Sequence, residues 1–493
     1  MDNSKENYSG IFKTTFLFGF VQVARLLMTV VKNKVVAILL GPQGVGIISI
    51  FKNAIDLIKT GASLGISQSA VKDISEANVS KDRNNFSITI SVVKKIVSLT
   101  SLLGLLITIV FSPLLSKWGF GDYDHIWAYI FLSIAVFFNI FLENQLSILK
   151  GMRMMRILAK TSLIGTFIGL IVGVPSIYFW KEDGIVISII ATAVASAIYT
   201  AKYIKKIKYD KVALSVKEIY RRATPMMKMG VSLMISNFLA FLSNLIILGF
   251  IQKKGGLLDV GLFHAGSVLV VSYFSMVTTA MSTDFYPRIS ECADDNQKLS
   301  SEIYKQSMVG LLILQPLIVG FILFLPLIID ILYTSEFSVI SDYVDIAIVG
   351  IIVSVISNCY GFTIIVKRAA KFYFIVSLIF SLSLVPLYMF FYTYYNLAGL
   401  GFAYALDVVA QLIVYYIYCR KYYEMKIHKH VVIDLAITFF LIYIIKLIRD
   451  SNNNYLVYGI GSIFLIMTIY IALIKMKKIM NIDIVKIIQY KKK

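Results

Sequence analysis

Long apolar stretches recur from one end of this 493-residue chain to the other. Each is long enough to cross a bilayer, whose hydrocarbon core of roughly 30 Å takes about 20 apolar residues in a helix. Lipid offers no partners to the backbone, so such stretches fold as helices that satisfy their own hydrogen bonds. The hydrophobic content of 58% and mean hydropathy of +0.79 agree with this. The sequence therefore predicts an all-α polytopic membrane protein.

The apolar stretches define about fourteen transmembrane helices. Their cores lie near residues 12–40, 46–71, 86–112, 126–149, 157–180, 185–204, 226–251, 258–283, 306–332, 343–366, 372–394, 398–419, 431–448 and 455–474.

The basic residues are distributed unevenly between the two sides of the predicted spans. With the N-terminus placed in the cytoplasm, about 37 of the 48 Lys and Arg residues fall on that side, and about 6 fall on the other. Cytoplasmic loops carry such an excess of positive charge. We therefore expect both termini in the cytoplasm, and the net charge of +20 is no argument for a nucleic-acid partner.

The connections between the spans are short. No external segment exceeds roughly a dozen residues, which leaves little room for the catalytic loop of a polymerase or ligase. A phosphate-binding loop of the GxxxxGKS kind is absent from the sequence, and the four histidines show no metal-ligand spacing. We expect no enzyme, metal or cofactor, but a transporter driven by energy stored in the membrane.

A weak internal repeat supports a transporter. A shift of about 215 residues aligns Gly41 with Gly256, Val45 and Gly46 with Val260 and Gly261, Ser67 with Ser282, and Ile74, Ser75 and Glu76 with Ile289, Ser290 and Glu291. Parallel repeats with a site at their interface are an architecture of alternating-access transporters. We predict two pseudo-symmetric six-helix lobes around a central cavity, at residues 1–215 and 216–425, and an additional transmembrane hairpin with a basic tail at 426–493.

Five cations interrupt the first two spans. They are Arg25, Lys32, Lys34, Lys52 and Lys59. The shift places them opposite Ala240, Ile247, Gly249, Ser267 and Phe274, so the second repeat makes the same spans without charge. A charge in a membrane span is costly, and it usually faces a cavity and marks function. The pattern predicts a cavity that binds an anion.

The polar residues of each span share one helix face. Within each span the polar residues are three or four positions apart. The set on the first span is Gln22, Arg25, Thr29 and Lys32, and that on the second is Ser49, Lys52, Asp56, Lys59 and Ser63. At about 1.5 Å per residue, Arg25 and Lys59 lie deep in the membrane, whereas Lys32 and Lys52 lie nearer the outer turn at residues 41–46. This predicts two cationic layers.

A structural explanation of the cations stays open beside the functional one. Asp56 is a charge partner that could pair with Lys52 or Lys59, while the remaining cations extend toward an interface. One carboxylate cannot neutralise five cations, however. We therefore favour an anion site at the deep pair.

The opening of the chain resembles a known family. The stretch from Leu40 to Gly46 (Leu-Gly-Pro-Gln-Gly-Val-Gly) follows a cationic span, and Gly61 to Ser67 lies on the next. Both are similar to the Wzx-type O-antigen translocases of the multidrug/oligosaccharidyl-lipid/polysaccharide exporter superfamily. The resemblance is sharpest over roughly the first eighty residues, and elsewhere it rests on length, span number and two-lobe layout.

This resemblance implies a function. Such translocases flip an undecaprenyl-pyrophosphate-linked oligosaccharide from the cytoplasmic to the periplasmic leaflet of the inner membrane. By analogy, Arg25 and Lys59 would bind the pyrophosphate and Lys32 and Lys52 would assist, since both residue types suit phosphate. The resemblance also implies a lipid-tail groove at the last two spans and, as candidate partners, a polysaccharide polymerase and a chain-length regulator.

Acidic residues within or near spans are candidates for binding a coupling ion, Na⁺ or H⁺. They are Asp407, Asp345, Glu143 and Asp434, with Asp407 favoured because it lies about two turns inside a span of the second lobe. Rival functions are a multidrug or other small-molecule exporter of the same superfamily, and a flippase for a peptidoglycan precursor. A membrane acyl- or glycosyltransferase is disfavoured by the short loops.

Overall fold

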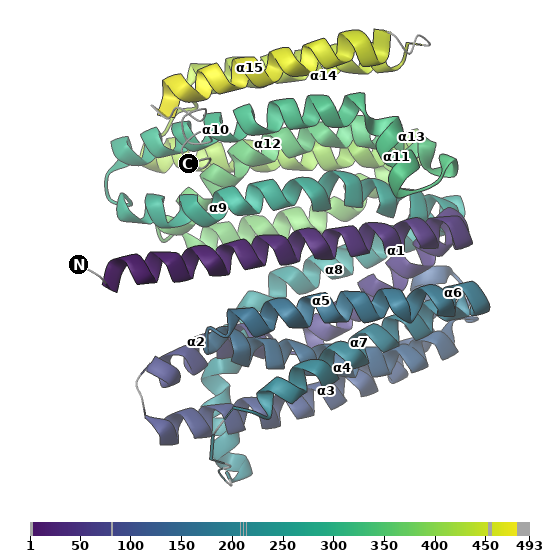
Figure 1. The fold of residues 1–493 in the computed structure, drawn as a ribbon, viewed down its shortest axis with the longest axis vertical. Coiled ribbons are helices and arrows are strands. Elements are labelled where there is room, and N and C mark those ends of the chain that lie inside the picture. Colours follow the sequence, from purple (N-terminus) through teal and green to yellow (C-terminus); the bar gives the residue numbers. More distant parts are fainter. Residues whose placement is uncertain are drawn as a thin grey trace. The chain divides into compact units, whose positions relative to one another are not determined.

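The computed structural model describes residues 3–79, 82–207, 209–210, 212, 214–451 and 456–480; for some residues in these ranges, such as 3–20 and Arg25, it describes the backbone alone. These described residues form helices joined by short turns and include no strand (Figure 1). Eleven helical runs among them are long and apolar enough to cross a membrane. Three of the eleven contain a break that separates two spans, which brings the number of spans to fourteen. The predicted all-α polytopic fold is confirmed.

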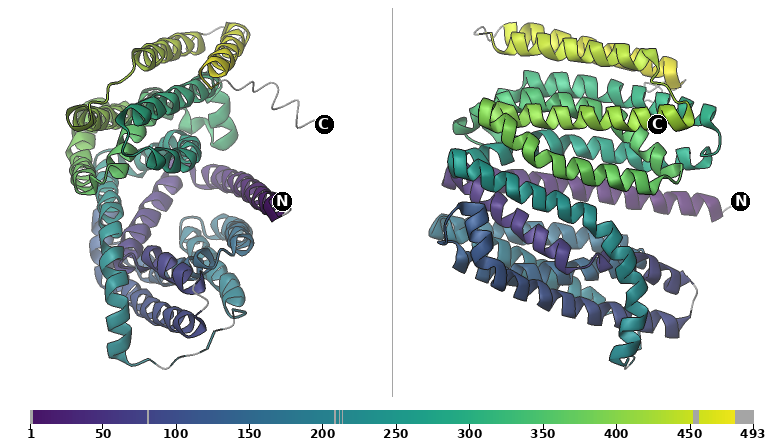
Figure 2. Two further views of the ribbon diagram at one scale, coloured as in Figure 1. Left: turned by 90° about the vertical axis from the view of Figure 1, so that its left-hand side faces the viewer. Right: turned by 180° about the vertical axis from the view of Figure 1, so that it is seen from behind.

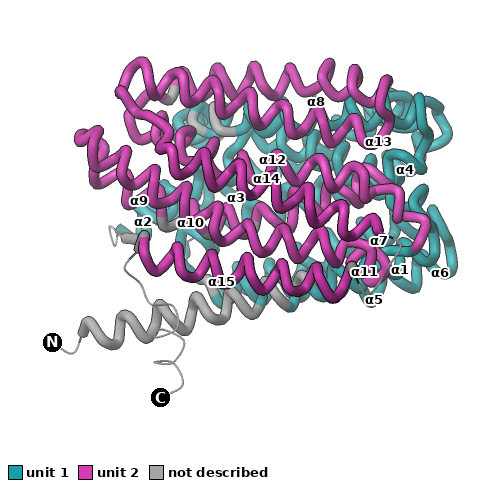
Figure 3. The backbone as a smooth tube through the Cα atoms, turned by 90° about the horizontal axis from the view of Figure 1, so that it is seen from above, with its two compact units in different colours: residues 1–261, 332–334 teal, residues 262–331, 335–493 magenta. Residues whose placement is uncertain are grey.

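The chain forms two compact units, coloured separately in Figure 3 and each described by itself below. Unit 1 consists of residues 1–261 and 332–334. Its helices are α1 (Asn3–Ala62), α2 (Ile66–Val79), α3 (Arg83–Phe120), α4 (Ile126–Gly151), α5 (Met155–Ile171), α6 (Gly173–Trp180), α7 (Asp183–Ile204) and most of α8 (Val216–Ser267). Helix α4 is central, because it packs against α1, α2, α3 and α7.

Unit 2 consists of residues 262–331 and 335–493. Its elements after α8 are η1 (Val268–Ser272), α9 (Tyr273–Glu291), α10 (Asn296–Leu323), α11 (Leu325–Leu332), η2 (Ser335–Val339), α12 (Ile340–Val366), α13 (Ala370–Tyr423), α14 (Lys429–Arg449), η3 (Leu456–Ile460) and α15 (Gly461–Met480). Helix α12 packs along α13, and α10 lies between α12 and the hairpin of α14 and α15, the yellow pair in Figures 1 and 2.

Backbone breaks reveal the internal repeat. Three pairs of residues with positive φ are separated by the same 215 positions: Gly41 and Gly256, Arg153 and Arg368, and Lys181 and Asn396. Positive φ is uncommon outside glycine, so its recurrence at one offset supports two pseudo-symmetric copies. The compact units divide after Gly261, while the lobe boundaries at 215 and 425 stay a prediction.

The glycine-containing turns of the two repeats, residues 41–46 and 256–261, touch within unit 1. A Cβ atom on Gly261 would lie 1.7 Å from the carbonyl oxygen of Pro42, and one on Gly46 would lie 2.4 Å from that of Leu257. Any side chain at these positions would collide with backbone. The repeated glycines Gly46 and Gly261 therefore allow the two backbones to approach closely.

Candidate functional site

Three helices of unit 1 converge on Lys59, in the last turn of α1. Its Nζ atom lies 2.8 Å from Asp56 Oδ1, one turn back on α1, and 3.1 Å from Glu143 Oε1 on α4. The Ser67 hydroxyl of α2 donates to Glu143 Oε2 at 3.5 Å. We call Asp56, Lys59 and Glu143 the Lys59 cluster.

The Lys59 cluster holds one cation and two carboxylates. All three side chains are partly open, with 20% of Lys59, 39% of Asp56 and 37% of Glu143 exposed. An ammonium group has three donors, and the two carboxylates account for two of them. An incoming anion can therefore use the third donor or displace a carboxylate.

Lys32 and Lys52 lie on the polar faces of α1, nearer in sequence to the break at Gly41 than Lys59 is, and no carboxylate of the described residues contacts them. Lys32 Nζ donates to Ser188 Oγ of α7 at 3.1 Å, and it is repelled by the ammonium group of Lys52. Lys52 is exposed and makes no hydrogen bond or ion pair with the described residues, although Asp56 acts on it electrostatically from one turn away. These two cations are available to a ligand.

The two remaining cations of the first spans differ from these. Lys34 donates to the backbone carbonyl of Tyr333, which belongs to the same unit. The side chain of Arg25, with that of Gln22, lies outside the described residues. The structure thus brings Asp56, Lys59 and Glu143 together, and the role of Arg25 stays a prediction.

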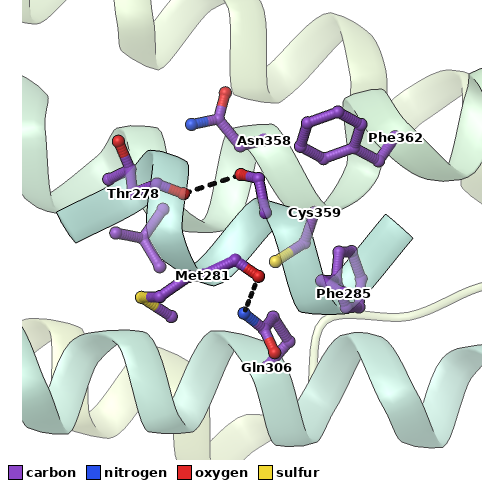
Figure 4. Close-up of a pocket in the computed structure, with 9 residues that line it drawn as sticks. Thr278, Met281, Phe285, Gln306, Asn358, Cys359 and Phe362 are labelled. Carbon is purple, nitrogen blue, oxygen red and sulfur yellow. Dashed lines mark hydrogen bonds between the residues drawn. The ribbon is translucent and has the colours of Figure 1, made fainter. Parts of the chain in front are cut away.

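In the second repeat, uncharged residues stand at the positions that correspond to Lys59 and Glu143. Ser282 and Asn358, which correspond to Ser67 and Glu143, line a cavity of about 10 Å³ among α9, α10 and α12 (Figure 4). Phe274 replaces Lys59 and is buried against Phe321, with ring centroids 5.2 Å apart. The fold is therefore built at this position from packed neutral side chains. The cations of the first repeat need an explanation other than folding.

Among the acidic candidates, Asp345 is already paired. Its buried carboxylate on α12 accepts two hydrogen bonds from Arg449 of α14, at 2.7 and 2.8 Å, and lies 3.3 Å from Lys446. Only 4% of its side chain is exposed. This pairing attaches the terminal hairpin to α12. Sequence reasoning missed it, because Arg449 is 104 residues from Asp345 and no local spacing relates the two.

Of the other two acidic candidates on unit 2, Asp434 is paired with a cation and, among the described residues, Asp407 is not. Asp434 is buried and pairs with Lys475, which joins α14 to α15. Asp407 on α13 is half-buried and makes no hydrogen bond or ion pair within the described part of the chain. It acts electrostatically on the phenol groups of Tyr388, Tyr404 and Tyr415. Of the four acidic candidates, Asp407 is thus the one whose carboxylate has no ion-pair partner among the described residues.

No group of three or more His, Cys, Asp or Glu side chains among the described residues could hold a metal ion.

Fourteen spans and two internal repeats define a class by fold, that of polytopic helical membrane proteins built from repeats. The sequence places the chain more closely. The model of the family described as "polysaccharide biosynthesis protein" matches residues 35–342, more than half of the chain. The chain belongs to this polysaccharide biosynthesis protein family. No curated protein matches it in sequence.

Solved structures share the fold at low identity. The structure of the lipid II flippase MurJ in an inward closed conformation is 16% identical, with a TM-score of 0.67, over 95% of this chain and 99% of that one. An inward-facing multidrug MATE transporter of the MOP superfamily is 14% identical, with a TM-score of 0.60, over 81% and 94%. The fold is that of flippases and transporters, and neither of these structures is of an enzyme.

A third solved structure also shares the fold. It is a MOP superfamily transporter from Pyrococcus furiosus, 16% identical with a TM-score of 0.53 over 83% of this chain and 94% of that one. That transporter is described as having a binding pocket of reverse polarity, which suggests a different function for it.

Proposed function

We propose that this protein is a flippase that moves an undecaprenyl-pyrophosphate-linked oligosaccharide, an O-antigen or similar repeat unit, between membrane leaflets by alternating access. The observation that carries the proposal is the pair of exposed or half-buried lysines, Lys32 and Lys52, that no carboxylate of the described residues contacts. A pyrophosphate carries the charge and acceptor oxygens that such lysines bind. The polysaccharide biosynthesis family supplies the expectation of a glycan.

The proposed role of each cation follows from whether a carboxylate contacts it. Lys32 and Lys52 attract and hold the pyrophosphate, because their ammonium donors are the least committed. Lys59 offers its third donor, while Asp56 and Glu143 stabilise its charge when the site is empty. Arg25, on the same face of α1 by spacing, adds a bidentate contact. The neutral equivalents in the second repeat leave the charge on one lobe.

A coupling ion completes the proposed cycle. Na⁺ or H⁺ binds at Asp407, because an uncommitted half-buried carboxylate suits a small cation. Asp345 and Glu143 are the weaker candidates, since each already contacts a cation.

The proposed setting follows from the charge distribution and the substrate. The protein lies in the bacterial inner membrane with both termini in the cytoplasm. Flipping then runs from the cytoplasmic to the periplasmic leaflet, where a polysaccharide polymerase and a chain-length regulator would receive the product.

Ligand selectivity tests this proposal against a multidrug exporter. Purified protein in detergent is titrated with undecaprenyl-pyrophosphate oligosaccharide, with the uncharged polyprenol, and with a lipophilic cation such as ethidium. We expect the pyrophosphate lipid to bind at least about tenfold more tightly than the polyprenol, since one charge-assisted hydrogen bond contributes about 1.5–3 kcal/mol. Binding of ethidium in preference to the pyrophosphate lipid would favour the exporter.

A further inference from the structure

A basic pocket lies in unit 2 and shares no residue with the Lys59 cluster. It has a volume of about 520 Å³ between α10, α14 and α15. Its lining includes Tyr304 and Lys305 of α10, His430 and Asp434 of α14, and Lys475 and Lys478 of α15. Three lysines face one carboxylate, so the lining is positively charged.

Two of the three lysines of this pocket form ion pairs, and the third forms none within the described part of the chain. Lys475 pairs with the buried Asp434, and Lys305 pairs at 2.8 Å with Glu302, which is outside the lining. Lys478 is exposed and has no hydrogen bond or ion pair with the described residues. Lys478 and the exposed side of Lys305 are therefore free to meet an anion at the mouth of the pocket.

The pocket lies at one end of all three helices. His430 and Asp434 fall within the first two turns of α14, Lys475 and Lys478 within the last two turns of α15, and Lys305 within the first three turns of α10. Helix ends on one side mark the level of lipid headgroups, and the charge distribution assigns this side to the cytoplasm. This assignment rests on the topology given with the proposed function.

An apolar strip continues from the pocket along the hairpin. Ile433, Ile437 and Phe440 of α14 follow a spacing of four and three, and they are 51%, 39% and 62% exposed. On a membrane protein such a strip faces acyl chains. A phosphate group in the pocket would thus have hydrocarbon beside it, as the headgroup of a bilayer lipid does.

We propose that this pocket binds the phosphate headgroup of an anionic phospholipid of the cytoplasmic leaflet and so ties the terminal hairpin to α10. Basic pockets between transmembrane helices on the cytoplasmic side bind anionic headgroups in this way. The ring of Tyr304, which belongs to the lining, packs against that of His428 with centroids 4.4 Å apart, and both are aromatic side chains of the kind found at the interface level. The hairpin is then held at its two ends by different means: Arg449 to Asp345 at one, and lipid at the other.

Native mass spectrometry of the full chain tests the proposal independently of translocation. The protein is titrated with phosphatidylglycerol and, separately, with zwitterionic phosphatidylcholine of the same acyl chains. The pocket variant Lys305→Gln/Lys478→Gln removes two exposed charges and keeps the Lys475–Asp434 pair. The matched control Lys298→Gln/Lys477→Gln removes two charges from the same helices at positions outside the lining.

We expect the unaltered protein to prefer phosphatidylglycerol, and the pocket variant to bind it about tenfold more weakly, since each lysine near a membrane surface contributes measurably to anionic lipid binding. The control should bind as the unaltered protein does. Equal weakening in both variants, or equal binding of the two lipids, would overturn the proposal. Undecaprenyl pyrophosphate is added in a third titration. If it binds in preference to phosphatidylglycerol and the pocket variant loses that binding, the proposal is overturned, because the pocket is then a loading site for substrate.

Discussion

Replacing Lys59 by methionine is expected to weaken binding of the pyrophosphate-linked oligosaccharide by about 10- to 100-fold. The change removes a charged donor, whose hydrogen bonds contribute about 1.5–3 kcal/mol, and it leaves Asp56 and Glu143 as an unbalanced negative pair. Affinity of purified protein for the lipid-linked pyrophosphate measures the effect. Lys72→Met, at an exposed ion pair on α2 with Glu76, is a control that should leave affinity unchanged.

A triple variant separates substrate binding from charge pairing. Asp56→Asn/Lys59→Met/Glu143→Gln removes the cation together with both carboxylates, so the Lys59 cluster becomes neutral. If Lys59 binds the pyrophosphate, the triple variant should stay at least about tenfold weaker than the unaltered protein. Recovery of full affinity in the triple variant would reduce Lys59 to a counter-ion for its two neighbours.

Replacing Asp345 by alanine is expected to destabilise the protein by about 3 kcal/mol. The change leaves Arg449, which is 7% exposed, as a buried charge without its bidentate partner, and breaking a buried ion pair costs about 3–5 kcal/mol. The lower figure applies because Asp450 still contacts Arg449 at 2.8 Å. The midpoint of thermal unfolding in detergent measures the change.

Two further variants sharpen this test. Asp342→Ala removes an exposed carboxylate three residues earlier on α12 and should leave the unfolding midpoint unchanged. Asp345→Leu/Arg449→Met removes both buried charges and should recover most of the loss, because a well-packed apolar pair can replace a buried ion pair. An unfolding midpoint for Asp345→Ala equal to that of Asp342→Ala would show that the pair does not hold the hairpin.

Much of the fold was predictable from the sequence. Fourteen spans follow from apolar runs that have no soluble alternative. The repeat was visible in a few residues, and the backbone breaks at Arg153 and Arg368 support it at the same offset. Those breaks themselves were not predictable, because an arginine with positive φ gives no signal in composition or periodicity.

The site was predictable in part, because spacing along a helix is a local property. Placing Asp56 and Lys59 on one face of α1 needed only the helical period. The contact between Lys59 and Glu143 joins α1 to α4, and that between Asp345 and Arg449 joins α12 to α14. Such pairings depend on tertiary packing between segments far apart in the chain. This is why Glu143 and Asp345 were interpreted as candidates for an ion rather than as partners of cations.

The most direct test of the central proposal is leaflet translocation of an undecaprenyl-pyrophosphate oligosaccharide in proteoliposomes, with the unaltered protein compared with Arg25→Ala and Lys59→Ala at matched insertion. The proposal predicts translocation by the unaltered protein and its loss in both variants, because transport requires the cations that bind the pyrophosphate. Absence of translocation by the unaltered protein across several glycans and ion gradients would contradict the proposed function. Unimpaired translocation by both variants would contradict the assigned site.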